Sequence, residues 1–421
     1  MKVLKKIPLI LWIVIAIGAG VLIGLFTPGM ISGINDATGA AIPTDLIVQL
    51  FVSFSTVFSA FLSFAIPLII IGFIVPGIGS LAQGAGKMLG ITVGLAYLSS
   101  ILAGFLALTC ALLLYPIILK GQQLASFDNP ENALSTGYVS IQLTPIMGVL
   151  SALILSFILG LGITALKTRA MLNLFEDFQV IVEKMLSYVI IPLLPVHIVG
   201  VFANMTLAGQ VAKILTVFVW VFAMIFILHW VTLTLQYSVA GAVSRRNPFK
   251  MLKTMMPAYL TAIGTQSSAA TIPVTVRSAK KAGVSARVAD FAIPLCATIH
   301  LSGSMITITS CAVAVLFMTG KGPDFGSLAP MVLVLGVMMV AAPGVPGGGV
   351  MTAIGLLESM LGFDSSMIAL YLAQDSLGTA TNVTGDATIA TLTERISKAI
   401  GANPDKEIRD EDIEKAEAIS A

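Results

Sequence analysis

Long apolar runs separated by short polar segments dominate this chain. Such runs, when about 20 residues long, are typical of helices that cross a membrane. The first half contains six of them, and the second half is more broken, with glycine, proline and hydroxyl residues inside its apolar stretches. The six runs occupy residues 7–26, 45–75, 87–115, 143–166, 174–204 and 208–239.

The composition agrees with a membrane-embedded chain. Hydrophobic residues make up 57% of the 421 residues, charged residues 10%, and the mean hydropathy is +0.98. A soluble protein could not cover its core with so few polar residues. The net charge of +2, without a basic stripe, argues against nucleic-acid binding, and three cysteines without ligand spacing predict neither a disulfide framework nor a metal framework.

Basic residues predict how the chain is oriented. They cluster before the first run, at the start of the third, and after the fourth and sixth, whereas the intervening loops carry at most one each. The positive-inside rule therefore places the N-terminus in the cytoplasm. The first run follows a basic start, as in a secretory signal, but its length and the absence of a small-x-small cleavage motif favour a retained helix. We expect a multi-pass membrane protein with both termini cytoplasmic.

Residues 254–276 predict a re-entrant helical hairpin. Basic clusters of the cytoplasmic type flank the segment on both sides, and its centre, from Gly264 to Ser268, is polar. Irregular backbone at membrane depth is tolerated only where it lines a cavity. The alternative is a single span kinked by its Ser and Thr residues, which would invert the orientation of everything that follows.

A second broken segment follows a seventh crossing at residues 288–317. Residues 328–361 are apolar but contain APGVPGGGV at 342–350, which a lipid-facing helix could not include. We predict a second hairpin, opening from the outside, and a last span from 364 to about 399, followed by a charged tail. The fold class is therefore all-α, with eight transmembrane helices and two hairpins in inverted repeats. That arrangement is typical of secondary transporters. The sequence has no phosphate-binding loop of the kind that an ATP-driven pump needs.

Polar side chains share one face of the last span. Asp375, Thr379, Asn382 and Asp386 follow one another at helical spacing. Carboxylates are costly inside a bilayer, so this face predicts a protein-lined cavity with a bound inorganic cation, a substrate ammonium or a proton as partner. An enzyme with an intramembrane aspartyl pair is an alternative, but Asp375 and Asp386 would stand roughly 16 Å apart along the helix, too far to share a proton.

Three motifs resemble those of the dicarboxylate/amino acid:cation symporter family, the glutamate transporter homologues. They are QSSAATIPVT at 266–275, PGVPGGG at 343–349 and QDSLGTATNVTGD at 374–386. The similarity covers essentially the whole chain, and the last motif is most similar to the bacterial serine/threonine symporters. The resemblance implies a transporter and not an enzyme, with no organic cofactor and with Na+ as a possible co-transported ion.

The resemblance also implies a homotrimer that works by an elevator mechanism. Each protomer would have a fixed scaffold and a mobile transport domain, with the second hairpin as extracellular gate. On this basis we assign 1–86 to scaffold spans one and two, 87–120 to span three of the transport domain, and 139–207 to scaffold spans four and five. Residues 208–400 would complete the transport domain, and 401–421 would form a cytoplasmic tail.

Carried over residue by residue, the resemblance implies a site for an amino acid. Asp375 would bind the substrate ammonium, and Asn382 and Ser268, with the backbone around Ser267, would bind its carboxylate. Contacts from the second hairpin and the side-chain end of the site would come from Val345, Gly349, Ser304, Gly378 and Thr379. An isolated Ser or Thr more often bonds back to its own helix, but the matched motifs favour the functional interpretation.

Two departures from the family pattern change the expected substrate. Acidic-substrate members carry an arginine where this chain has Gly378, and some carry one where it has Gln266. No fixed cation would then balance a carboxylate on the substrate's side chain. We therefore predict a small neutral amino acid of the Ser, Thr or Ala class.

A third departure concerns the coupling ion. The family's NMDGT-type motif reads His300-Leu301-Ser302-Gly303-Ser304 here, so two oxygen ligands are replaced. Sodium ligands could still come from Thr298, Asn382 and Asp386. Alternatively, a protonated His300 near Asp386 would stand in place of sodium and make the carrier proton-coupled or sodium-independent, or His300 is a neutral structural histidine. A channel is a further alternative, but the polar groups gather in one internal pocket and not along a continuous pore.

Overall fold

A computed structural model describes most of the chain. It covers residues 9–81, 86–120, 137–139, 141, 143–166, 169–209, 211–339, 342, 348–363, 367–368, 371 and 378–401. Within these ranges all regular structure is helical and no strand occurs, which confirms the all-α prediction. Six of the described helical segments are long and apolar enough to cross a membrane.

The first half of the chain forms long helices. They are α1 (Leu9–Thr38), α2 (Leu46–Leu81), α3 (Gly86–Ile118), α4 (Val149–Ala165), α5 (Ala170–Met185), a π-helical turn (Leu186–Ile190), α6 (Ile191–Leu207) and α7 (Val211–Ser244). Helix α1 continues well beyond the predicted end at residue 26 because Pro28 does not stop it. Pro28 lies inside the helix, and apolar helices tolerate such prolines where neighbouring groups compensate the missing backbone bond.

The second half consists of shorter helices. They are α8 (Pro248–Thr254), α9 (Met256–Thr265), α10 (Ser268–Ala282), α11 (Ala286–Ile299), α12 (Ser302–Met318), α13 (Phe325–Met339), α14 (Gly348–Leu361) and α16 (Gly378–Ala399). Helix α16 is nearly surrounded by protein: most of its residues from Gly378 to Thr393 are buried, including its hydroxyl and carboxylate side chains. This burial explains how so polar a helix is accommodated in an apolar chain.

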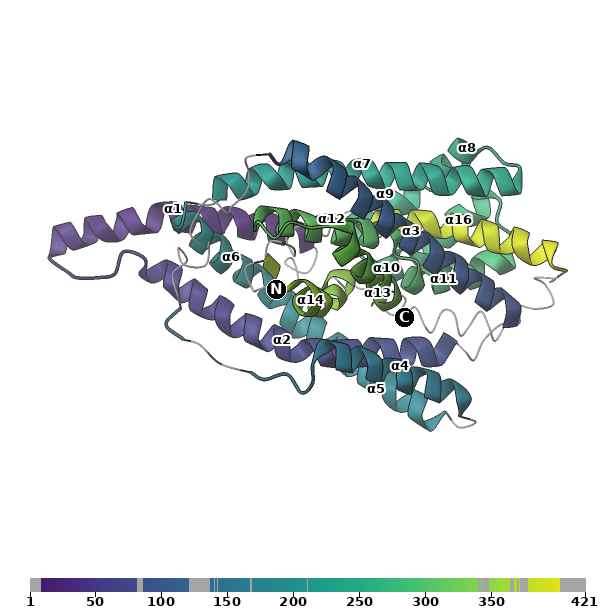
Figure 1. The fold of residues 1–421 in the computed structure, drawn as a ribbon, viewed down its shortest axis with the longest axis horizontal. Helices are drawn as coiled ribbons and strands as arrows, with labels where there is room; N and C mark the ends of the chain where they lie inside the picture. Colours follow the sequence, from purple (N-terminus) through teal and green to yellow (C-terminus); the bar gives the residue numbers. More distant parts are fainter. Residues whose placement is uncertain are drawn as a thin grey trace.

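The helices form two packing groups. In one, α2 packs on α4, α5 and α6, and α1 packs on α6. In the other, α3 packs on α12 and α13, and α16 packs on α7, α9, α10, α11 and α12. Figure 1 shows α2, α4 and α5 along one side of the molecule and α7 along the opposite side. Helix α14 contacts both α2 and α4 of the first group and α12 and α13 of the second, so it lies at their boundary.

A sharp turn divides residues 254–276 between two helices, α9 and α10. Helices α9 and α10 pack against each other, which the arms of a single kinked span would not do. The chain reverses at Gln266, whose φ of 53° is left-handed, and at Ser267, which caps α10 by accepting from the Ala270 N–H at 3.2 Å. Both arms also contact α16, so the hairpin tip is formed beside the polar helix.

The second broken segment has the same arrangement. Helices α13 and α14 pack against each other on either side of the glycine-rich stretch. Residues 343–347 of that stretch, with Val345, lie outside the described residues, as do 372–377 with Asp375 and the tail from 402. Depth in the membrane, and so re-entry, stays a prediction for both hairpins.

The helix of the seventh apolar run is interrupted near its polar middle. Helix α11 ends at Ile299, His300 and Leu301 are not helical, and α12 begins at Ser302. Side chains from other helices satisfy the backbone N–H groups that this break exposes. The Ser100 hydroxyl of α3 accepts from the Leu301 N–H at 3.2 Å, and Asn382 of α16 accepts from the next turn. The break is therefore stabilised by tertiary contacts.

Candidate functional site

The interruption between α11 and α12 meets α16 at the centre of the second packing group. Asn382 lies at this meeting point, buried to 3% exposure. Its Oδ1 accepts from the N–H groups of Gly303 at 2.7 Å and Ser304 at 3.2 Å, and its Nδ2 donates to Oγ of Ser304 at 3.0 Å. The amide thus caps α12 and holds the Ser304 side chain in place.

Four of the predicted substrate residues come together around Ser304. A Cβ built on Gly378 would lie 3.2 Å from Oγ of Ser304, and one built on Gly349 would lie 3.5 Å from the same atom. Gly349 lies in the first turn of α14, and Gly378 begins α16. Asn382 completes the group, while Thr379, beside Gly378, is half-buried. The structure therefore gathers hydroxyl, amide and glycine residues from three helices at one place.

The remaining predicted substrate residues lie elsewhere or outside the described residues. Ser268 is buried at the first hairpin tip, and Ser267 is half-buried beside it. Asp375 and Val345 belong to the undescribed segments. Helix α10, which begins at Ser268, packs against α16.

The predicted sodium ligands all have protein partners. The Thr298 hydroxyl donates to the Leu295 carbonyl of its own helix at 3.0 Å, the local bond expected of an isolated threonine. Asn382 caps α12, as described above. Oδ1 of Asp386 lies 2.9 Å from Nδ1 of His300, and both side chains are buried, at 1% and 0% exposure. An imidazole therefore occupies the position beside Asp386 where the sequence left sodium and a proton as alternatives.

Several residues near this pair were missed by the sequence reasoning. Oγ of Ser99 lies 3.1 Å from Nε2 of His300, and the Gln236 amide donates to Ser99 at 2.9 Å and to Ser302 at 3.1 Å. On α7, Nε2 of His229 lies 3.0 Å from the Gly303 carbonyl oxygen. Polar residues inside otherwise apolar runs, such as Gln236, are candidates for a functional site. They could have been used to predict this network.

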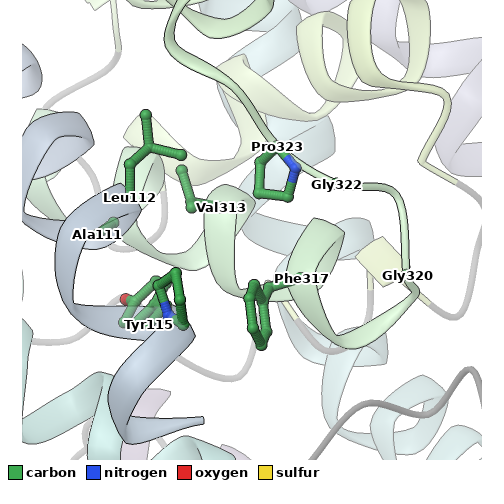
Figure 2. Close-up of a pocket in the computed structure, with 9 residues that line it drawn as sticks. Ala111, Leu112, Tyr115, Val313, Phe317, Gly320, Gly322 and Pro323 are labelled. Carbon is green, nitrogen blue, oxygen red and sulfur yellow. The ribbon is translucent and has the colours of Figure 1, made fainter. Parts of the chain in front are cut away.

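A separate apolar pocket of about 170 Å³ lies between the ends of α3 and α12. Figure 2 shows Leu112 and Tyr115 of α3 facing Val313 and Phe317 of α12, with Pro323 from the following loop. None of the predicted site residues lines it. It is therefore distinct from the polar group around Ser304.

Comparison with known proteins identifies the family. A model of the sodium:dicarboxylate symporter family matches residues 9–396. The chain belongs to this family. Its members are symporters and not enzymes, and the family together with the apolar helices makes this chain a multi-pass membrane protein.

Individual relatives within the sodium:dicarboxylate symporter family are excitatory amino acid transporters. Human excitatory amino acid transporter 1 is 31% identical over 180 residues, which cover 42% of this chain and 33% of the relative. Human excitatory amino acid transporter 2 is 33% identical over 184 residues, covering 42% and 32%. An excitatory amino acid transporter of Caenorhabditis elegans is 26% identical over 299 residues, covering 68% and 58%. The chain thus spans between about a third and three-fifths of the length of these relatives.

Proposed function

We propose that this chain carries a small neutral amino acid of the Ser, Thr or Ala class across the cytoplasmic membrane of a prokaryote, coupled to a cation. Membership of a sodium-coupled symporter family supports the transport class. The position of Gly378 beside Ser304 is the observation that supports a neutral substrate. Position 378 has no side chain and therefore no charge, and the groups gathered there are a hydroxyl, an amide and glycines. A carboxylate on the substrate's side chain would find no cation among these residues.

The proposed mechanism is an elevator motion in a homotrimer. The separate packing of α1, α2, α4, α5 and α6 from the remaining helices supports this proposal, and α14 contacts helices of both groups. Cross-linking of the full chain in membranes, followed by mass measurement, tests the trimer; a monomer under conditions that preserve uptake would contradict it.

Uptake into proteoliposomes tests the substrate. Labelled serine, threonine, alanine and aspartate are offered to the reconstituted full chain, with sodium and proton gradients imposed separately and protein-free liposomes as control. We expect uptake of at least one of the three neutral amino acids to exceed that of aspartate by tenfold or more. Uptake dominated by aspartate would overturn the argument from Gly378.

A proton-coupled or sodium-independent carrier is the second candidate, and the His300–Asp386 pair favours it. The carboxylate already has a nitrogen partner at 2.9 Å, and a histidine can carry the proton that would couple transport. We expect uptake by the wild-type chain to respond to a proton gradient and His300→Asn to lose that response. An unchanged ion dependence in His300→Asn would show that the imidazole has no role in coupling.

A further inference from the structure

We propose that the imidazole ring of His300 is a built-in occupant of a cation site, held in place by Ser99 and Gln236, and that it keeps sodium from the Asp386 carboxylate. The inference rests on the proposed function, in that the excluded cation is the family's co-transported ion. It adds two positioning residues, from α3 and α7, and it predicts that removal of the ring creates a sodium site.

Both ring nitrogens of His300 are held by partners on different helices. Nδ1 lies 2.9 Å from Oδ1 of Asp386 in α16, and Nε2 lies 3.1 Å from Oγ of Ser99 in α3. The ring itself has no exposed surface. Because two bonds in opposite directions fix a planar ring, the imidazole cannot turn away from the carboxylate without breaking one of them.

Gln236 fixes the position of the Ser99 side chain. Its Nε2 donates to the hydroxyls of Ser99 and Ser302, so one amide ties α7 to α3 and to the first turn of α12. The other end of the amide, Oε1, is buried and has no hydrogen-bond partner among the described residues. A buried acceptor without a donor is unfavourable, and it is an oxygen available to a cation.

Gly385 brings this free oxygen to the edge of the ring. A Cβ built on Gly385 would lie 2.7 Å from both Oε1 of Gln236 and Cε1 of His300. The amide oxygen and the ring edge therefore both lie close to a residue without a side chain. Any larger residue at 385 would push one of them away.

The groups around the ring are those that hard cations prefer. Asp386 and Ser99 contact the ring, Gln236 lies at its edge, and Ser302 lies one hydrogen bond further on. Together they provide carboxylate, hydroxyl and amide oxygens, the ligand types typical of sodium-like hard cations. Without the ring, Asp386 would be a buried charge with no partner among the described residues, and a cation entering the vacated space would compensate it.

Thermal unfolding of the purified full-length protein in NaCl, compared with choline chloride, tests the proposal without requiring transport. A cation that binds only the native state raises Tm. We expect His300→Ala to show an NaCl-dependent rise in Tm on the order of 3 °C above that of the wild type. His300→Phe is the matched control: it refills the space without nitrogen atoms and should show no added rise.

The supporting residues give a second comparison. Gln236→Leu combined with His300→Ala should reduce the added rise, because one oxygen ligand is lost. Equal NaCl effects in the wild type, His300→Ala and His300→Phe would overturn the proposal. If His300→Ala does not fold, the wild type still decides the question: an NaCl-dependent rise that disappears in Asp386→Asn would show that sodium already reaches this carboxylate.

The outcome is separable from that of the uptake experiment. Failure to take up neutral amino acids would refute the proposed substrate and leave the sodium-binding comparison intact. Failure of His300→Ala to gain sodium binding would refute the present proposal and leave the substrate class standing.

Discussion

Asn382 of α16 caps Gly303 of α12 across the interruption in the seventh apolar run, with Oδ1 of the amide 2.7 Å from the backbone nitrogen of Gly303. The same oxygen also accepts from Ser304 at 3.2 Å. One side chain therefore satisfies two of the N–H groups that a helix start leaves open. The start of α12 is therefore stabilised by a side chain of the polar helix α16.

Removal of this cap should destabilise the protein measurably. We expect Asn382→Ala to cost about 1–3 kcal/mol, because the Gly303 N–H is buried and would lose its acceptor. Thermal unfolding in detergent measures the loss. Asn247→Ala is a matched control, since Asn247 caps α8 by accepting from the Lys250 N–H at 3.1 Å at an exposed site where water can replace it. A loss in Asn382→Ala no greater than in Asn247→Ala would contradict the role given to Asn382.

A methyl group at Gly303 should be tolerated poorly. A Cβ there would lie 2.3 Å from the Gly378 carbonyl oxygen and 2.7 Å from Cβ of Thr381. Because the first of these atoms belongs to the backbone, α12 and α16 would have to separate. We expect overpacking in Gly303→Ala to reduce the free energy of unfolding by about 1–3 kcal/mol. The midpoint temperature of thermal unfolding should fall accordingly.

The control for that variant is Gly264→Ala. Gly264 is an exposed helical residue of α9 with nothing within 4 Å of a built Cβ, so alanine should be neutral or stabilising by roughly 0.5–1 kcal/mol. Equal Tm values for the two variants would show that the close approach of α12 and α16 is not a constraint.

The buried hydroxyl of Tyr237 should contribute to stability. It donates to the Thr384 carbonyl at 2.7 Å and joins α7 to α16. We expect Tyr237→Phe to cost about 1 kcal/mol, because the carbonyl would lose a partner at a buried position. Tyr188→Phe is the control, since Tyr188 is 72% exposed. Chemical or thermal unfolding of both variants provides the comparison, and a smaller loss for Tyr237→Phe than for Tyr188→Phe would count against the bond.

Asp324, in the loop before α13, should titrate below an ordinary aspartate. Hydrogen bonds from the Ser327 hydroxyl, at 2.6 Å, and from its N–H, at 3.0 Å, lower the pKa of this carboxyl. Because the folded pKa is the lower one, the stabilisation is fully present above about 3.9, the unfolded value, and is lost as pH falls through the folded value. Carbon NMR of the carboxyl measures the midpoint, and Ser327→Ala should raise it. An unchanged midpoint would show that Ser327 does not interact with Asp324 in solution.

The sequence by itself determined the fold class and the outline of the two hairpins. Runs of about 20 apolar residues can only be accommodated in lipid or in a buried core, and in lipid the backbone must be helical. Glycine, proline and serine inside such runs predict where the helix must stop, and α9 ends and α10 begins at such a place. The same local reasoning placed Asn382 and Asp386 on one face of α16. Local preferences were sufficient because each of these features depends on residues close together in the chain.

Only the tertiary structure decided what surrounds those residues. The break at His300 and Leu301 has no glycine or proline, and it exists because Ser100 and Asn382, about 200 residues before it and 80 residues after it, supply the missing acceptors. The sequence likewise did not decide which group pairs with Asp386. Sodium, a proton and an imidazole were all compatible with its carboxylate. The packing of α3, α7, α12 and α16 placed His300, Ser99 and Gln236 beside it. Contacts between residues so far apart in the chain follow from how helices pack, and the periodicity of a single helix contains no information about them.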